Sequence, residues 1–326
     1  MRKLLPPKNV LKNMHCWLNI DRVPHDTEST EWKRFARWLQ AKWREEQGYP
    51  VGSQPYNGGL GSYPVGSRIE LEFARSSGVN FITPSALSAV RVRLANPELH
   101  QMLSEERLWA DALSSMPLCF NLFGDLAADP ECATEALRAW WPDTPHGKVI
   151  VRFEHSPGRR NVLFLGNRSA FDVAFEIEIG AGQCGIIGVE TKYQEHTKIE
   201  PPPNTHALAR YTVITECSMA FFSDWRNRVV GTELQQIWLD HLLVLSMLQH
   251  PSGRWSWGRF ILVYPEGNSS FARAANSYRE VLKDKSTFEP RTIEDLIQTS
   301  NALDPTTAFA LQRRYLGNGS TTQCWN

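Results

Sequence analysis

The stretch 171–193, FDVAFEIEIGAGQCGIIGVETKY, reads as two strands joined by a turn. Apolar and polar residues alternate on both sides of a glycine-rich centre, which predicts a β-hairpin. A turn centred on Ala181 would pair residues whose numbers sum to 362. Asp172 then lies opposite Glu190, and Lys192 shares their face because side chains alternate along a strand. Two carboxylates and one ammonium group are therefore expected on one face of a sheet.

This face has the composition of a metal-dependent hydrolytic site. Carboxylates directly opposite each other on neighbouring strands repel, and a divalent cation relieves that repulsion. Mg²⁺ prefers octahedral oxygen ligands and keeps several waters, so Asp172, Glu190 and the backbone carbonyl of Thr191 would form half of its shell. Lys192 would orient the attacking water and stabilise developing negative charge. The pattern predicts phosphodiester hydrolysis; the alternative is a surface ion-pair ladder without chemistry.

The segments around this hairpin predict an α/β (α+β) fold. KVIVRFE (148–154) and NVLFL (161–165) flank a turn and predict a further hairpin. The apolar stripe of 232–249 predicts a helix, and RFILVYP (259–265) predicts a buried strand. Helical periodicity extends on both sides, over residues 68–76, 84–95, 97–128, 269–285, 291–300 and 305–316.

The beginning of the chain predicts an added, mainly helical region. Within it, 29–46 (STEWKRFARWLQAKWREE) places tryptophan and phenylalanine at helical spacing. Gly, Pro, Ser and Asn dominate residues 48–67, which predicts a loop, and their glycines match no nucleotide-binding turn. We therefore expect a helical region over residues 1–95 and a second domain over 96–326 that ends in a helical extension.

Composition narrows the classes of function. The 326 residues include 35 basic and 35 acidic side chains, so nucleic-acid contact would have to come from local patches. The six cysteines are scattered without a CxxC pair, which argues against a zinc site or a disulfide framework and for a reduced, cytoplasmic protein. No apolar run follows the basic start or reaches transmembrane length, so neither a secretory signal nor a membrane partner is expected.

Several segments carry a family resemblance. SAFDVAFEI (169–177) followed by IGVETKY (187–193) resembles the PD-(D/E)xK phosphodiesterase superfamily, whose core is helix, three strands, helix and strand. The segments on either side of this hairpin resemble a bacterial family of restriction endonucleases on this scaffold. These segments are SSMPLCFNLFGDLA (114–127), YPEGN (264–268) and NSYREVL (276–282). The resemblance would cover most of the chain and implies a mixed central sheet flanked by helices.

The same resemblance implies roles for the hairpin residues. Asp172 and Glu190 would be metal ligands and Lys192 the catalytic lysine, whereas Phe171 stands where the motif has proline. The implied activity is that of a Mg²⁺-dependent DNA endonuclease of restriction or anti-phage defence type, in which Mn²⁺ substitutes for Mg²⁺. Double-stranded DNA would be the substrate, and a homodimer or a defence-system protein would be a partner. A non-catalytic nucleic-acid-binding or assembly subunit, an RNA nuclease and exonuclease action stay open.

Loops next to the predicted strands carry side chains that suit phosphate or base contact. The candidates for substrate contact are Gln194, Arg159, Arg160 and Arg168. Some superfamily members also direct an acidic residue of the first core helix at the metal, and the candidates here are Glu105 and Glu106. Candidate platforms for base stacking are Trp255 and Trp257, which lie beside arginines.

Overall fold

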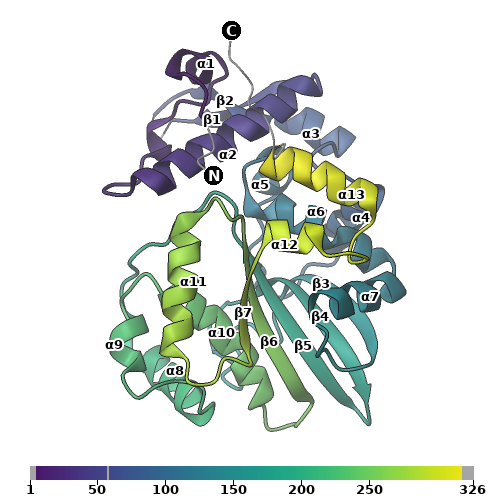
Figure 1. The fold of residues 1–326 in the computed structure, drawn as a ribbon, viewed down its shortest axis with the longest axis vertical. Helices are drawn as coiled ribbons and strands as arrows, with labels where there is room; N and C mark the ends of the chain where they lie inside the picture. Colours follow the sequence, from purple (N-terminus) through teal and green to yellow (C-terminus); the bar gives the residue numbers. More distant parts are fainter. Residues whose placement is uncertain (1–4, 57–58, 318–326) are drawn as a thin grey trace.

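The computed structural model describes residues 5–56 and 59–317, and a five-stranded mixed sheet lies at its centre (Figure 1). The strands, in spatial order, are β3 (Lys148–His155), β4 (Phe171–Gly180), β5 (Gln183–Thr191), β6 (Trp255–Tyr264) and β7 (Phe288–Thr292). The first three run antiparallel to one another, whereas β6 is parallel to β5 and β7 to β6. The expected mixed sheet flanked by helices is confirmed.

The β4–β5 hairpin has the predicted register. Val173 pairs with Val189 and Ala174 with Gly188, so the paired numbers sum to 362. The second predicted hairpin is wrong, because residues 161–165 form turns and β3 pairs with β4 instead. This segment is apolar because it is a loop whose Phe164 and Leu165 side chains are buried in one of the two hydrophobic cores.

Helices cover both faces of the sheet. One face carries α6 (Ser115–Ala128) and α7 (Pro130–Trp140), preceded by α5 (Glu105–Ala110). The helices of the other side are α8 (Thr205–Cys217), α9 (Trp225–Val229), α10 (Gln235–Leu248) and α11 (Ser269–Val281). Alternate strand residues supply the two cores, since Val173 packs with the first set of helices and Ala174 with the second.

Asp129, the residue after the predicted helix 97–128, is also the N-cap of the next helix, α7. The Asp129 side chain accepts hydrogen bonds from the backbone N–H groups of Glu131 and Cys132, and Pro130 occupies the first turn, so these residues also begin α7. The predicted helix over 97–128 is divided, because its capping serines lie at two places. Ser104 caps α5 and Ser114 caps α6.

The N-terminal region contains a hairpin as well as helices. Its elements are α1 (Lys8–Asn13), the 3-10 turn η1 (Asn19–Asp21), α2 (Thr27–Glu46), β1 (Val51–Pro55), β2 (Ser62–Ile69), α3 (Leu71–Ser77) and α4 (Pro84–Ala95). The loop predicted for 48–67 is therefore wrong over most of its length, since β1 and β2 pair antiparallel. Two of its glycines serve close packing: a Cβ on Gly66 would lie 2.0 Å from the Met14 carbonyl oxygen, and one on Gly52 2.4 Å from that of Ile69.

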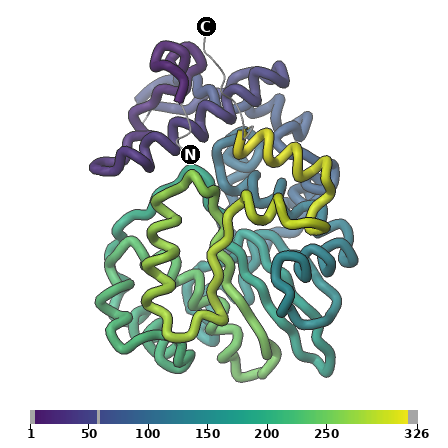
Figure 2. The backbone as a smooth tube through the Cα atoms, viewed as in Figure 1, coloured from purple at the N-terminus to yellow at the C-terminus, as the bar shows by residue number. Residues whose placement is uncertain are grey.

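The two ends of the described chain meet beside α2. After β7 the chain forms α12 (Ile293–Gln298), α13 (Pro305–Leu311) and the π-helical turn η2 (Gln312–Leu316), which returns to the N-terminal region (Figure 2). Gln40 of α2 donates a hydrogen bond to the carbonyl oxygen of the buried Arg314 at 2.9 Å. Trp32 and Val173 belong to the same core, so α2 packs continuously with the sheet. The division between residues 95 and 96 stays a prediction.

The sequence predicted neither a membrane-spanning helix nor disulfide bonds. None of the helices in the described part of the chain is long and apolar enough to cross a membrane. The five cysteines within residues 5–56 and 59–317 are free thiols, in keeping with reduced cysteines, whereas Cys324 lies outside the described residues.

We expect the buried His241 to make the stability of the fold decrease at acidic pH. It lies on α10, its two ring nitrogens are 2.9 Å from the hydroxyls of Tyr278 and Thr287, and burial lowers its pKa to about 3. A histidine that stays neutral in the folded state stabilises it fully above pH 6.5 and progressively less as pH falls toward 3. At pH 5 the loss is about 2 kcal/mol. Urea unfolding of His241→Gln against the wild type should show a flatter decline between pH 7 and 5; equal slopes would contradict this.

Candidate active site

Three carboxylates lie in a row across β3, β4 and β5. The hairpin register sets Asp172 opposite Glu190, one position beyond the Val173 pair. On the other side, Phe153 pairs with Val173, so Glu154 faces Asp172. Glu154 was not predicted as a site residue, although it ends the predicted strand 148–154. The signal was present in the alternation, but it became usable only once β3 was known to pair with β4.

Asp172 is held by the strand that carries the other motif residues. Its Oδ2 accepts a hydrogen bond from the backbone N–H of Thr191 at 2.7 Å. Burial, followed by the negative charges of Glu190 and Glu154, holds the pKa of Asp172 well above its usual range. Burial and the Glu190 charge also raise the pKa of Glu154 to about 7. The row is therefore electrostatically unfavourable as it stands, which is the condition that a bound cation would relieve.

Lys192 brings a positive charge into direct contact with Glu190 of the row. Its Nζ lies 2.7 Å from Glu190 Oε1, and its backbone N–H donates to the carbonyl of Val263 on β6 at 2.8 Å. Burial opposes the charge of Lys192, but the carboxylates of Glu190, Asp240 and Glu195 outweigh it and raise the pKa. Lys192 therefore stays protonated and acts as a fixed cation.

Asp240 brings a further carboxylate to the site from α10. Burial and the charge of Glu190 raise the pKa of Asp240 well above its usual range, and Lys192 opposes that shift. Its Oδ2 is buried without a hydrogen-bond partner among the described residues. Asp240 was not predicted from the sequence either: an acidic side chain stands out within the apolar run IWLDHLLVL, but nothing in that run indicates which strands it faces.

The backbone around Glu154 is held in an uncommon conformation. Glu154 has a φ of 48°, in the left-handed region that costs a residue with a side chain about 1–3 kcal/mol. Arg159 donates from Nη2 to the Glu154 carbonyl oxygen at 2.8 Å and also pairs with Glu98. Glu98 accepts from the N–H of Ser156 at 3.0 Å and lies 2.7 Å from His155 Nδ1. These contacts fix the turn that directs Glu154 toward Asp172.

Glu98 stays ionised beneath this turn. Burial acts to raise its pKa, but the hydrogen bond from His155, that from Ser156 and the charge of Arg93 together lower it to about 2. Arg159 is only 3% exposed in its pair with Glu98. The structure thus gives this arginine a supporting place behind the carboxylate row, away from solvent.

The remaining candidate residues lie at different distances from the row. Arg160 and Arg168 are exposed on the loop between β3 and β4. Glu105 and Glu106 are exposed at the start of α5, and Glu106 forms an ion pair with Arg68 at 2.6 Å. Trp255 packs edge-on against Phe164, 5.7 Å between centroids, so the protein itself covers one proposed stacking platform.

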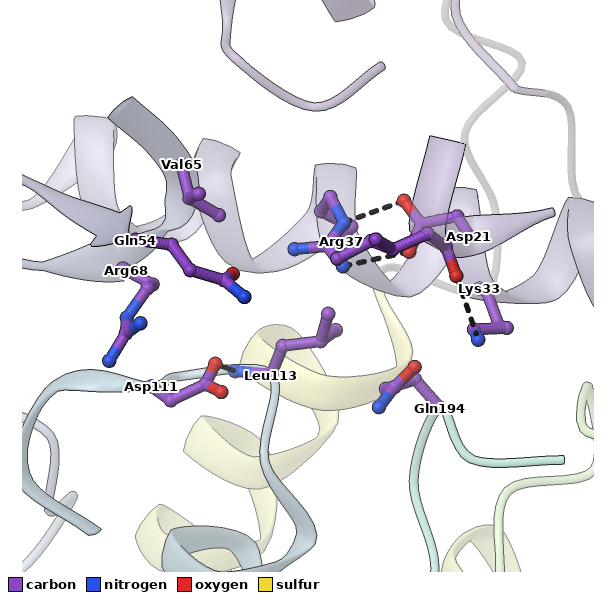
Figure 3. Close-up of a pocket in the computed structure, with 10 residues that line it drawn as sticks. Asp21, Lys33, Arg37, Gln54, Val65, Arg68, Asp111, Leu113 and Gln194 are labelled. Carbon is purple, nitrogen blue, oxygen red and sulfur yellow. Dashed lines mark hydrogen bonds and ion pairs between the residues drawn. The ribbon is translucent and has the colours of Figure 1, made fainter. Parts of the chain in front are cut away.

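Gln194 lies on a segment that two parts of the chain hold in place. Asn268 donates from Nδ2 to the carbonyl oxygens of Tyr193 at 3.1 Å and Glu195 at 2.8 Å. The indole N–H of Trp32 donates to the same Tyr193 carbonyl at 2.8 Å. Asn268 belongs to the YPEGN segment, so that segment positions the chain immediately after Lys192. Gln194 itself lines a pocket between this segment and the N-terminal region (Figure 3).

The donor set of the site fits a hard divalent cation. Asp172, Glu190 and the carbonyl of Thr191 offer oxygen atoms only, which suit Mg²⁺ and Mn²⁺ better than Zn²⁺. No three His, Cys, Asp or Glu side chains within residues 5–56 and 59–317 converge closely enough to hold a metal by themselves. An ion here would therefore depend on water and substrate oxygens for much of its shell, as Mg²⁺ commonly does.

Comparison with known proteins agrees with this geometry. The family model described as the PD-(D/E)XK nuclease superfamily matches residues 24–317. The chain belongs to the PD-(D/E)XK nuclease superfamily. No curated protein and no solved structure shows significant similarity to it. The match leaves the resemblance to one restriction endonuclease family as a prediction, and superfamily membership indicates phosphodiester hydrolysis.

The departure from the superfamily's proline has a packing explanation. A Cβ on Gly188 of β5 would lie 2.3 Å from the ring of Phe171, so the ring lies flat over the glycine. Phe171 is almost fully buried in the core formed by α8, α10 and α11. The phenylalanine thus fills space in the core next to Asp172.

Proposed function

We propose that the protein is a metal-dependent DNA endonuclease whose active site is centred on Asp172, Glu190 and Lys192. The observation that carries this is the carboxylate row facing a buried, protonated lysine on three adjoining strands. A structural ion pair would need one carboxylate per lysine. Here Asp172 and Glu190 share it, and Glu154 adds a third negative charge that Arg159, Arg93 and Arg107 offset only in part. This arrangement costs stability without a cation and gains a function with one.

The residues divide the hydrolytic step among them. Asp172, Glu190 and the Thr191 carbonyl would hold a divalent cation, with Mn²⁺ able to replace Mg²⁺. When bound, that cation would polarise the phosphate and promote ionisation of the attacking water. Glu154 would accept a hydrogen bond from this water and align it with the leaving oxygen. Lys192 would stabilise the charge on the phosphoryl oxygens as the water oxygen bonds to phosphorus and the P–O bond breaks.

The substrate and setting extend this proposal. Double-stranded DNA and a restriction or anti-phage role follow from the resemblance described above, and a cytoplasmic location follows from the scattered cysteines without a CxxC pair. A homodimer would bring two sites to the two strands of a duplex, and Arg160 and Arg168 are exposed near the loop that precedes β4 for contact with phosphates.

The direct test is cleavage of supercoiled plasmid by the purified protein with Mg²⁺, with Mn²⁺ or with EDTA. Nicked or linear DNA is expected with either cation and none with EDTA. If neither plasmid nor single-stranded RNA is cut with either cation, the nuclease proposal fails and a non-catalytic binding role takes its place.

Glu154→Gln should lower the cleavage rate about 10- to 100-fold, the usual effect of removing a group that orients a metal site. The amide keeps the shape of the side chain but loses the charge that faces Asp172. Glu178→Gln is the matched control, because Glu178 is an exposed carboxylate on β4, opposite Lys148. Steady-state rates on plasmid would show the difference; equal rates for the two variants would remove Glu154 from the site.

A further inference from the structure

A groove on the N-terminal region combines aromatic and basic side chains. It encloses about 610 Å³ between α1, η1 and the β1–β2 hairpin. Its lining includes Lys8, Lys12, Trp17, Ile20, Tyr56 and Tyr63, and none of the described residues that line it carries a carboxylate. We call these residues the aromatic groove. Its charge is therefore positive, although the chain as a whole is balanced.

The aromatic groove presents ring surface to solvent. The ring of Tyr56 is on a side chain that is 52% exposed, and the aliphatic Ile20 of the same lining is 48% exposed. The rings of Tyr56 and Tyr63 lie 5.1 Å apart, so each limits the rotation of the other. Trp17 is already covered by Lys8 Nζ at 5.0 Å from its ring centroid, which places an ammonium group at the groove. Exposed rings beside ammonium groups suit stacked bases and their phosphates.

A second pocket adjoins this groove and is lined by Gln194, which follows the active-site strand β5. It encloses about 210 Å³, and Ile20 lines both cavities. Figure 3 shows the carboxamides of Gln54 and Gln194 on opposite walls, with Arg68 between the hairpin and Asp111. Neither carboxamide is hydrogen-bonded to another lining residue that Figure 3 draws. We call this the inner pocket.

The lining of the inner pocket includes Gln194 but not Asp172, Glu190 or Lys192. Gln194 follows Lys192 by two residues, so their Cα atoms lie within about 7 Å of each other. Arg37 cannot contribute a free charge there, because it is bound to Asp21 through Nε at 2.6 Å and Nη2 at 2.7 Å. Arg68 is likewise engaged, by Glu106 at 2.6 Å, so the carboxamides of Gln54 and Gln194 are the groups that we expect to pair with a base edge.

We propose that the aromatic groove and the inner pocket form a path along which an unpaired DNA strand reaches the active site. Bases would stack on Tyr56 and Tyr63, while Lys8 and Lys12 would hold phosphates. Gln54 and Gln194 would contact the nucleotide nearest Lys192. A duplex keeps its base faces stacked inside, so it could not use the rings in this way. The inference rests on the proposed nuclease function for the destination of the path, and it deepens the substrate to DNA with an unpaired segment.

Binding without cleavage tests the path. Fluorescence anisotropy with a labelled oligonucleotide of about 20 nucleotides, single-stranded or annealed to its complement, would be measured in EDTA. Tyr56→Ala combined with Tyr63→Ala should weaken single-strand binding about 5- to 100-fold. Matched controls are Phe222→Ala and Phe309→Ala, at exposed rings outside both cavities, 47% and 65% exposed, which should bind as the wild type does.

The lysines should give a separate signature. Lys8→Ala combined with Lys12→Ala should reduce the slope of log affinity against log salt by about 1.4, because each phosphate that is no longer neutralised lowers it by about 0.7. Equal affinity for duplex and single strand, or wild-type affinity in the double tyrosine variant, would overturn the path. If neither plasmid nor single-stranded DNA is cut while the single-strand preference is intact, the proposed function alone is rejected, because the binding assay needs neither metal nor catalysis.

Discussion

Lys192→Ala is expected to lower plasmid cleavage about 100- to 1,000-fold, the effect of removing one group that stabilises transition-state charge. The ammonium group is buried, protonated and 2.7 Å from Glu190 Oε1, so no solvent cation at ordinary salt replaces its position. Single-turnover cleavage with saturating Mg²⁺ would measure the chemical step itself. A rate within threefold of the wild type would remove Lys192 from the mechanism.

The alanine variant also leaves Glu190 without its partner, which lowers stability because an unpaired buried carboxylate is costly. Lys192→Arg separates the two effects, since it keeps the positive charge but moves it to a longer, planar group. We expect the arginine variant to unfold near the wild-type temperature and still to cut poorly. Lys198→Ala, at an exposed lysine six residues along the chain, is the control for loss of a positive charge.

The hairpin was predictable because its sequence constrains it from both ends. Alternation along each strand sets which face a side chain joins, and the glycine-rich centre around Ala181 sets the register. A one-residue shift would have moved Asp172 to the face of the core that holds Val173 and Val189. The hydrophobic pattern therefore excluded other registers, and the face shared by Asp172, Glu190 and Lys192 followed.

Glu154 and Asp240 were missed because their positions depend on tertiary pairing. The alternation in 148–154 indicates which residues share a face with Glu154. The apolar run 161–165 is closer in sequence than β4, so it was predicted to be the partner strand. Apolar residues in a buried loop and in a strand look alike without a period to separate them. Asp240 lies one helix further on, and nothing local to α10 indicates that it packs on β5 and β6.

The aromatic groove was unpredictable for a different reason. Tyr56 and Tyr63 come from the segment predicted to be a loop, because glycines that allow close packing look the same as glycines that make turns. Gly66 lies against Met14, and Gly52 lies against Ile69. Stacking surfaces were instead expected at Trp255 and Trp257, which are partly buried on β6.

Asp172→Asn is expected to abolish measurable cleavage and at the same time to raise the thermal midpoint in EDTA. The first effect is the loss of a ligand charge, on the order of 1,000-fold at least by analogy with other charge-stabilising groups. The second follows from the raised pKa of Asp172, since burial, Glu190 and Glu154 all disfavour its charge. Asparagine keeps an oxygen to accept the Thr191 N–H and adds no charge to the row.

The pH dependence of stability tests whether the Asp172 charge destabilises the folded state. A carboxyl whose folded pKa is raised costs the folded state nothing below its unfolded pKa, near 4, and destabilises increasingly as pH rises above it. The stability gain of Asp172→Asn should therefore be present at pH 7, at roughly 2–4 °C per kcal/mol, and vanish near pH 4. Glu178→Gln, which neutralises an exposed carboxylate on the same strand, should show no such gain.

With added Mg²⁺, the wild type should become more thermally stable than Asp172→Asn. A cation that binds only the folded state raises the wild-type midpoint by mass action, and the asparagine variant should respond much less. A variant that is more stable in EDTA, less stabilised by Mg²⁺ and inactive would mean that the carboxylate row is maintained for its cation at the expense of the fold. An asparagine variant that is less stable than the wild type in EDTA at pH 7 would instead mean that Asp172 is a structural partner of Thr191, and the metal assignment would fail with it.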